Sequence, residues 1–158
     1  MSNDIDRKMM ELAIEQARLA LENGDIPVGA VVAVNGEVVA TAYNRREADN
    51  DPTAHAEVLA LREAGHRLGS WRLSEATVYI TKEPCVMCAG ALMSARVARV
   101  VYGVQDPKYG AAWSVFNILQ DDRLNHRAEV TAGVLADECM ALLREFFEGR
   151  RVNSIDKS

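Results

Sequence analysis

Four residues in two short segments have the types and the spacing of a metal-dependent catalytic site. His55 and Glu57 lie two residues apart in the first segment, and Cys85 and Cys88 lie three residues apart in the second. Cysteines at positions i and i+3 of a helix project from the same side, so two thiolates can bind one tetrahedral ion. With His55 they form a three-ligand set that suits Zn²⁺ and leaves the fourth position open for water. An open position predicts a catalytic zinc site.

Glu57 is the candidate proton carrier of this site. A carboxylate beside a metal-activated water can accept a proton and deliver it again. Residues i and i+2 point about 200° apart on a regular helix, so His55 must lie in an irregular first turn if both are to face the metal. Pro52 and Thr53 just upstream are typical of such a helix start. The alternative for Glu57 is a solvated first-turn carboxylate that interacts with the helix dipole.

Two other sites could contain the same cysteine pair. A redox Cys-x-x-Cys motif has this spacing, but it needs neither a histidine nor an acid. A closed structural zinc site would need a fourth ligand, for which Cys139, His66 and His126 are the candidates. Cys139 falls on an apolar stripe of the last predicted helix, where a free cysteine usually acts as a small buried hydrophobe. That stripe comprises Ala136, Cys139, Met140, Leu143 and Phe147.

The composition is that of a single globular domain spanning residues 1–158. Of the 158 residues, 49% are hydrophobic and 26% are charged, which gives a core large enough to fold without a disulfide or a structural metal. Three cysteines and the absence of a signal-like or membrane-spanning stretch predict a cytoplasmic protein. The net charge of −5 argues weakly against a polyanionic partner, although a local basic patch could still bind phosphates.

The hydrophobic patterns alternate between helices and strands. A first helix is predicted between Asp4, its expected N-cap, and Gly24, with a core stripe of Ile5, Met9, Leu12, Ala13 and Ala20. Strands at 28–34 and 38–43 flank Asn35-Gly36, a strong hairpin signal. Helices at 53–65, 85–94, 112–119 and 135–148 and strands at 77–81, 97–102 and 129–131 follow. Together they predict a three-layer α/β/α fold around a mixed five-stranded sheet.

The motifs resemble a known family. His-x-Glu followed by Pro-Cys-x-x-Cys is similar to the signature of the zinc-dependent cytidine/deoxycytidylate deaminase superfamily. Residues 51–57, 83–91, 125–127 and 135–139 are similar to bacterial tRNA-specific adenosine deaminases, and this likeness extends along nearly the whole chain. The resemblance implies a cytidine deaminase-like fold, one zinc per subunit and a homodimer whose active sites lie near the subunit interface. It also implies hydrolytic conversion of adenosine to inosine at the wobble position of an arginine tRNA, with Glu57 moving the protons.

The resemblance also implies which residues contact the anticodon stem-loop. Asn44 would hydrogen-bond the target base and the backbone of Ala56 would orient it, whereas Asp106 and Lys108 would lie along the anticodon backbone. From the residues alone, Asn44 could be a turn-former at a strand end, and the loop around Asp106 could be a polar turn.

The end of the last helix combines aromatic and basic residues. Phe146 and Phe147 could stack on bases, and Arg150 and Arg151 could bind phosphates. Phe147 also continues the apolar stripe, which favours packing for at least one of the two phenylalanines. The arginines could equally be a solvated tail.

Three residues depart from the family pattern, and all three concern the RNA-facing region. Tyr109 stands where a small residue or threonine is expected, Trp113 where a glycine is expected, and Tyr43 where many members have tryptophan. These departures leave the zinc chemistry unchanged and bear on the shape of the substrate pocket. Two other functions stay open: a deaminase of a free base or nucleoside such as guanine or cytosine, which shares the same zinc motif, and a non-catalytic zinc-stabilised nucleic-acid-binding module.

Overall fold

The computed structural model describes the backbone of residues 2–156 and the side chains of residues 4–149. Helices and strands follow one another in the predicted order, except that the helix expected between the last two strands is absent. In chain order they are α1 (Ser2–Glu22), β1 (Gly29–Val34), β2 (Glu37–Tyr43), α2 (Ala56–Leu68), β3 (Ala76–Lys82), α3 (Val86–Ser94), β4 (Arg99–Val104), β5 (Glu129–Ala132) and α4 (Ala136–Asp156).

The five strands form one mixed sheet in the order β2-β1-β3-β4-β5. β1 pairs antiparallel with β2 and β3, whereas β3, β4 and β5 run parallel. Parallel neighbours need a crossover connection, which α3 supplies between β3 and β4. The carboxyl ends of β3 and β4 therefore meet at one edge of the sheet, where ligands bind in open α/β folds.

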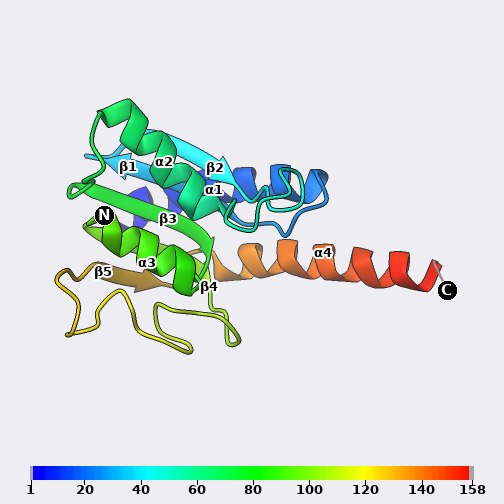
Figure 1. The fold of residues 1–158 in the computed structure, drawn as a ribbon. Helices are drawn as coiled ribbons and strands as arrows, with labels where there is room; N and C mark the ends of the chain where they lie inside the picture. Colours follow the sequence, from blue (N-terminus) through cyan, green and yellow to red (C-terminus); the bar gives the residue numbers. More distant parts are fainter. Residues whose placement is uncertain (1, 157–158) are drawn as a thin grey trace.

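The helices form two layers on opposite faces of the sheet (Figure 1). α2 and α3 pack on one face over a buried cluster that includes Ala60, Ile80 and Leu92. α1 and α4 contact each other and cover the other face over a second cluster that includes Met10 and Leu142. The predicted three-layer α/β/α fold is confirmed.

The Asn35-Gly36 turn joins β1 and β2 as predicted. Both residues have positive φ, 52° for Asn35 and 78° for Gly36. A type I′ hairpin turn requires this conformation at both central positions, and asparagine and glycine adopt it at low cost. The local sequence therefore sets the pairing next to the turn, where Val34 is opposite Glu37, and the register shifts by one residue between Val32 and Ala33.

The predictions for α1 are partly wrong. Gly24 follows the helix end with a φ of 79°, as expected. Asp4 is not the N-cap, because the helix begins at Ser2. Ile5 and Leu12 are 50% and 36% exposed, whereas Met9, Ala13 and Ala20 are buried as predicted. At about 100° per residue, Ile5 and Leu12 lie beside the buried face and not on it.

The helix predicted at 112–119 is absent, and the chain forms turns there. The backbone amides of Ala112, Trp113 and Ser114 donate to the carboxylate of Glu83, which lies 29 to 31 residues earlier in the chain. This long-range contact replaces the local pattern that suggested a helix. Within the described residues, no helix is both long and apolar enough to cross a membrane.

Candidate metal centre and active site

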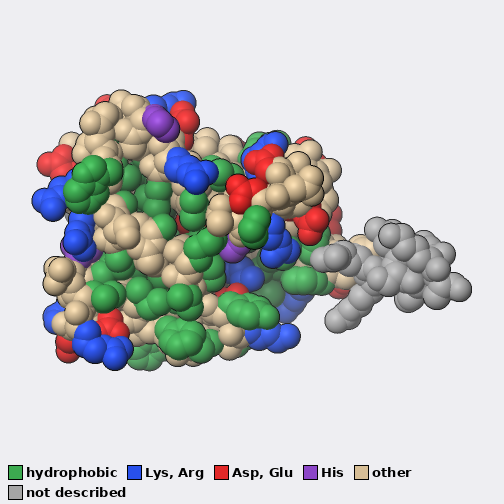
Figure 2. All heavy atoms as spheres, in the orientation of Figure 1, with side chains coloured by type: hydrophobic (Ala, Val, Ile, Leu, Met, Phe, Trp, Pro, Cys, Tyr) green, Lys and Arg blue, Asp and Glu red, His purple; other side chains and the backbone are tan. Residues whose placement is uncertain are grey.

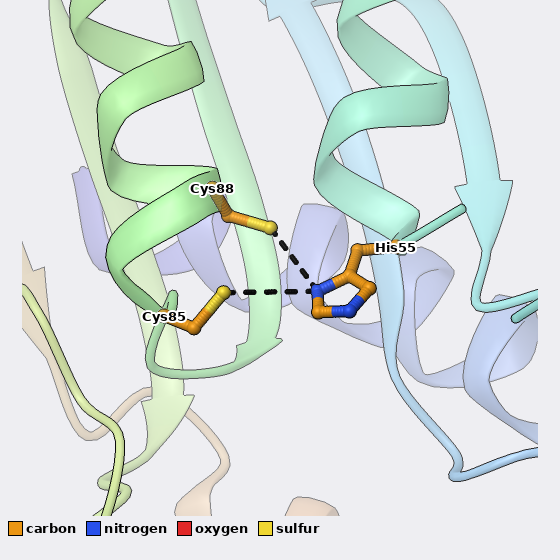
Figure 3. Close-up of side chains that lie close together, drawn as sticks. All are labelled: His55, Cys85 and Cys88. Atoms are coloured by element: carbon orange, nitrogen blue, oxygen red, sulfur yellow. Dashed lines mark hydrogen bonds between the residues drawn. The ribbon is translucent and has the colours of Figure 1, made fainter. Parts of the chain in front are cut away.

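The three predicted metal ligands converge from the starts of two helices (Figure 3). His55 is the N-cap of α2, with φ −76° and ψ 149°, and Cys85 is the N-cap of α3, with φ −76° and ψ 178°. Cys88 lies in the first turn of α3. Because His55 has an extended backbone, it and Glu57 can both point into the site. The expected irregular start of this helix is confirmed.

The distances between the ligand atoms fit a tetrahedral zinc ion. His55 Nδ1 lies 3.4 Å from Cys88 Sγ and 3.7 Å from Cys85 Sγ. Zinc–sulfur bonds of about 2.3 Å and zinc–nitrogen bonds of about 2.0 Å at tetrahedral angles require a nitrogen–sulfur separation of about 3.5 Å. The arrangement is therefore already close to the geometry that a bound zinc needs.

None of the three candidate fourth ligands joins this group within the described residues. Cys139 is buried in the cluster under α1 and α4, on the other face of the sheet. A ring nitrogen of His126 lies 2.7 Å from the carbonyl oxygen of Val97. His66 lines a different groove, between α2 and α3. The protein thus offers three ligands, as an open catalytic site does.

The thiol groups of Cys85 and Cys88 shift each other's pKa. The thiol of Cys88 donates a hydrogen bond to Cys85, which with His55 lowers the pKa of Cys85 to about 4. The same shared proton and burial raise the pKa of Cys88. The hydrogen bond with Cys85 also raises the pKa of His55, against the effect of burial. One negative charge therefore forms readily on this pair, and a second one needs a bound cation.

Glu57 is buried next to this cluster. Only 4% of the residue is exposed, and burial raises the pKa of its carboxyl group above the ordinary range. The alternative of a solvated helix-start carboxylate is therefore wrong. A carboxyl group with a raised pKa is suited to accept and return a proton near neutral pH.

The metal site opens into a cleft of about 740 Å³. The volume is in the range of pockets that hold small ligands such as nucleosides. Five of the predicted substrate-binding residues line this cleft: Asn44, Ala56, Asp106 and Lys108, which the resemblance assigned, and Phe147, which was predicted from its residue type.

The two phenylalanines of α4 have different environments. Phe146 is buried and does not line the cleft, whereas Phe147 is 47% exposed and does. Their rings meet edge to face with centroids 5.3 Å apart. The inference that Phe147 continues the core stripe is therefore wrong, because Phe146 fills that role. Arg150 and Arg151 lie outside the described side chains.

Asn44 forms a turn and also faces the cleft. Its side-chain oxygen accepts a bond from the amide of Arg46, and its side-chain nitrogen donates to the carbonyl of Ile26, both at 3.1 Å. The turn-forming role is therefore confirmed. A primary amide has two donor hydrogens and two acceptor lone pairs, so one of each remains for a ligand.

Asp106 organises the loop after β4. One carboxylate oxygen accepts the amides of Lys108 and Tyr109, and the other lies 3.1 Å from the Lys82 ammonium. Burial alone would raise the pKa of Asp106, but the contact with Lys82 and these hydrogen bonds lower it. Lys108 is exposed at the edge of the cleft.

Sequence reasoning missed most of the cationic lining of the cleft. Arg46, Lys82 and Arg144 lie there together with Lys108. The overall charge of −5 conceals this local concentration. Arg46 lies two residues after Asn44, the predicted base-binding residue, and this proximity was the one feature of the sequence that could have placed Arg46 in the cleft. Arg144 lies three residues before Phe147 on α4 and had no such signal.

The three departures from the family pattern occupy different places. Tyr109 lines the cleft and is 66% exposed. Trp113 is 67% exposed on the same loop but does not line the cleft. The hydroxyl of Tyr43 accepts a hydrogen bond of 2.8 Å from Arg45, away from the cleft. Of the three, Tyr109 is therefore the one placed to contact a substrate in the cleft.

Comparisons with known proteins agree with this site. A family model described as MafB19-like deaminase matches residues 4–151. The tRNA-specific adenosine deaminase of Bacillus subtilis (strain 168) is 49% identical over 146 residues, which cover 92% of this chain and 91% of that protein. A solved structure from work on A-to-I editing by tRNA:A34 deaminases has a TM-score of 0.83 and 42% identity, over 86% of this chain and 99% of its own.

A guanine deaminase structure is also similar, though less so. The enzyme from Bacillus subtilis is 37% identical with a TM-score of 0.61, over 70% of this chain and 69% of its own. Both the identity and the coverage are higher for the tRNA enzymes than for this guanine deaminase. The chain belongs to the bacterial tRNA-specific adenosine deaminases of the cytidine/deoxycytidylate deaminase superfamily.

Proposed function

We propose that this protein converts adenosine to inosine at the wobble position of a tRNA anticodon, with an arginine tRNA as substrate. The observation that supports the proposal best is the His55, Cys85 and Cys88 group beside buried Glu57 at the base of a cleft. The relatives that match along nearly the whole chain are named tRNA-specific adenosine deaminases.

The ligand set fits one zinc ion per chain. A zinc ion held there would supply a water of lowered pKa as the nucleophile. Glu57 would take a proton from that water and pass it to a ring nitrogen of adenine as the oxygen bonds to C6. Glu57 would then take the proton of the new hydroxyl group on C6 and deliver it to the amino group, so that the C6–N bond breaks, ammonia leaves and the inosine carbonyl forms.

The cleft residues supply recognition in this proposal. The free donor and acceptor of Asn44 would bond the base, and the backbone of Ala56 would orient it. Lys108, Arg46 and Arg144 would bind the phosphates beside the target nucleotide, and Phe147 would stack on a flanking base. Asp106 would set the loop that carries Lys108.

An inosine assay tests the proposal. The zinc-loaded protein is incubated with an unmodified transcript of an arginine tRNA, and inosine is located by sequencing. Conversion at the wobble adenosine is the expected result, and no inosine at that position would contradict the proposal. A matched transcript with guanosine at the wobble position serves as the control.

Deamination of free guanine is the second candidate, because a guanine deaminase is 37% identical. Ammonia release from guanine, cytosine and their nucleosides in the absence of RNA tests it. Salt separates the two activities further: phosphate contacts weaken steeply as salt rises, whereas a free base carries no phosphate. A non-catalytic zinc module would release no ammonia from any of these substrates.

We also infer that the chain is a single deaminase domain of residues 1–158 that works as a cytoplasmic homodimer. All described strands join one sheet, and the three cysteines are free. Figure 2 shows hydrophobic side chains gathered over the face that α2 and α3 cover. A groove between these helices is lined partly by apolar residues, including Val58, Leu61 and Trp71, and a second copy of the chain could cover it. Light scattering after size-exclusion chromatography tests the dimer.

A further inference from the structure

Glu83 is a buried carboxylate that the chemistry above does not use. It follows β3 and precedes Pro84 and Cys85, and only 3% of it is exposed. Its Oε1 accepts the amide of Asp106 at 3.0 Å and the hydroxyl of Ser114 at 2.5 Å. Its Oε2 accepts three consecutive backbone amides, from residues 112–114, at 2.9 to 3.2 Å. Five donors thus meet one side chain.

This donor set suits a carboxylate and no other side chain. A carboxylate accepts at both oxygens and has no hydrogen to clash with the five donors. Hydrogen bonds to a charged acceptor are about twice as strong as neutral ones. An amide in the same place would direct an NH₂ group at backbone amides, so a glutamine cannot reproduce the contacts.

Further contacts press the same loop against the end of β3. The amide of Ala111 donates to the carbonyl of Pro84 at 2.8 Å, and Lys82 pairs with Asp106. Gly110 lies so close to the Glu83 carboxyl group that a Cβ at this position would collide with it. Residues 82–84, which lead directly to the ligand Cys85, therefore hold both ends of the 106–114 loop.

The loop that Glu83 holds forms one side of the cleft. Asp106, Lys108 and Tyr109 line it, and Tyr109 is 66% exposed. The loop contains no helix or strand that could hold its shape. Its conformation therefore depends on contacts with other parts of the chain, and Glu83 supplies the largest group of them.

We propose that Glu83 is a positioning residue that sets the 106–114 loop in the conformation that receives the RNA beside the target base. This inference rests on the proposed activity toward tRNA. The metal ligands are held by α2 and α3 and by their own contacts, none of which involves the Glu83 side chain. Loss of the carboxylate should therefore weaken substrate binding and leave the metal in place.

The test compares Glu83→Gln with Glu75→Gln, a change at an exposed glutamate just before the same strand. Zinc content, hydrogen exchange of the loop amides, and kcat and KM for an anticodon stem-loop are measured for both variants and the wild type. In Glu83→Gln we expect one zinc per chain, faster exchange at residues 106 and 112–114, a KM raised about tenfold or more and a kcat within about twofold. Glu75→Gln should match the wild type.

The outcomes separate this inference from the activity on which it rests. A wild-type protein that makes no inosine would contradict the proposed function itself. Faster loop exchange with an unchanged KM, or a KM change accompanied by zinc loss, would contradict the positioning role.

A milder variant keeps the test valid if Glu83→Gln does not fold. Ser114→Ala removes one of the five donors and leaves the carboxylate in place. It should raise KM in the same direction by about twofold to fivefold with kcat and zinc unchanged. An unchanged KM in Ser114→Ala, with the loop amides exchanging faster, would overturn the inference.

Discussion

The two sides of the cleft are built in different ways. The metal side consists of His55, Cys85 and Cys88, which are fixed at helix starts within two short segments. The loop side is the 106–114 segment, which adjoins Pro84 and whose shape depends on Glu83, more than 20 residues away in the sequence. Local spacing therefore specifies the chemistry, and long-range hydrogen bonds shape the surface that selects the substrate. Mutations on the two sides should affect different kinetic constants.

The largest effect is expected when a metal ligand is changed. Cys85→Ser replaces a thiolate with a hydroxyl that binds zinc poorly, so zinc content should fall from about one per chain toward zero and deamination should become undetectable. Metal analysis and inosine formation check this. Cys139→Ala, on the other face of the sheet, is the matched control and should retain zinc and activity. Full zinc occupancy in Cys85→Ser would mean that the ligand assignment is wrong.

The next largest effect is expected at Glu57. Glu57→Gln keeps the shape of the side chain but cannot carry a proton, so kcat should fall by about 10² to 10⁴ while zinc content stays unchanged. Glu63→Gln, at a partly exposed position of the same helix, should have wild-type kcat. Activity that survives in Glu57→Gln would show that another group moves the proton.

Tyr109 tests the loop side of the cleft. Its exposed ring can stack on a flanking base, and such stacking contributes about 1–3 kcal/mol. Tyr109→Ala should therefore raise KM for the stem-loop about 5- to 150-fold and leave kcat and zinc unchanged. Trp113→Ala, on the same loop but outside the cleft, is the comparison and should change KM less. Equal effects of the two variants would mean that the ring of Tyr109 makes no special contact.

A smaller effect is expected from the cationic side chains of the cleft. Lys108→Ala removes one phosphate contact. In a plot of the logarithm of the stem-loop association constant against the logarithm of the salt concentration, the negative slope should therefore become smaller by about 0.7. Binding measured at several salt concentrations checks this value. Lys8→Ala, at an exposed position of α1, should leave the slope unchanged. A wild-type slope in Lys108→Ala would place this side chain away from the RNA.

The contrast between the two sides also explains what the sequence could and could not predict. Turn residues and ligand spacing act locally, so the Asn35-Gly36 hairpin and the His55 helix start were predicted correctly. The helix at 112–119 was wrong because its amides bond a side chain in another segment. No local pattern records such a contact.

The errors in the helices have a related cause. Ile5 and Leu12 were wrongly predicted to belong to the buried face of α1. The prediction placed only apolar residues inside and therefore did not include Asp6, which is buried. Asp6 faces the sheet since Arg99, 93 residues away, binds its carboxylate. On α4, two adjacent phenylalanines made the buried one ambiguous, and only the packing shows that it is Phe146.

The Asp6–Arg99 pair offers a third region in which stability and activity should separate. Arg99 is the first residue of β4, so the pair lies at the end of the strand opposite the cleft. Hydrogen bonds from Arg99 lower the pKa of Asp6, although burial opposes them. Because the pKa of Asp6 is lower in the folded chain than in the unfolded chain, where it is about 3.9, the pair stabilises the fold at pH values above about 3.9. This stabilisation is lost as the pH falls through the pKa of the folded state.

Asp6→Asn should therefore lower the free energy of unfolding by about 3 kcal/mol at pH 7, because Arg99 keeps a partly buried charge without its partner. The difference from the wild type should shrink as the pH falls below about 4. Urea unfolding at several pH values measures it, with the exposed Asp4→Asn as the control. At 25 °C and pH 7 both kcat and KM should stay at wild-type values, because neither side of the cleft contacts this pair. A change in KM would show that the conformation of the loop held by Glu83 depends on the Asp6–Arg99 pair at the far end of the sheet.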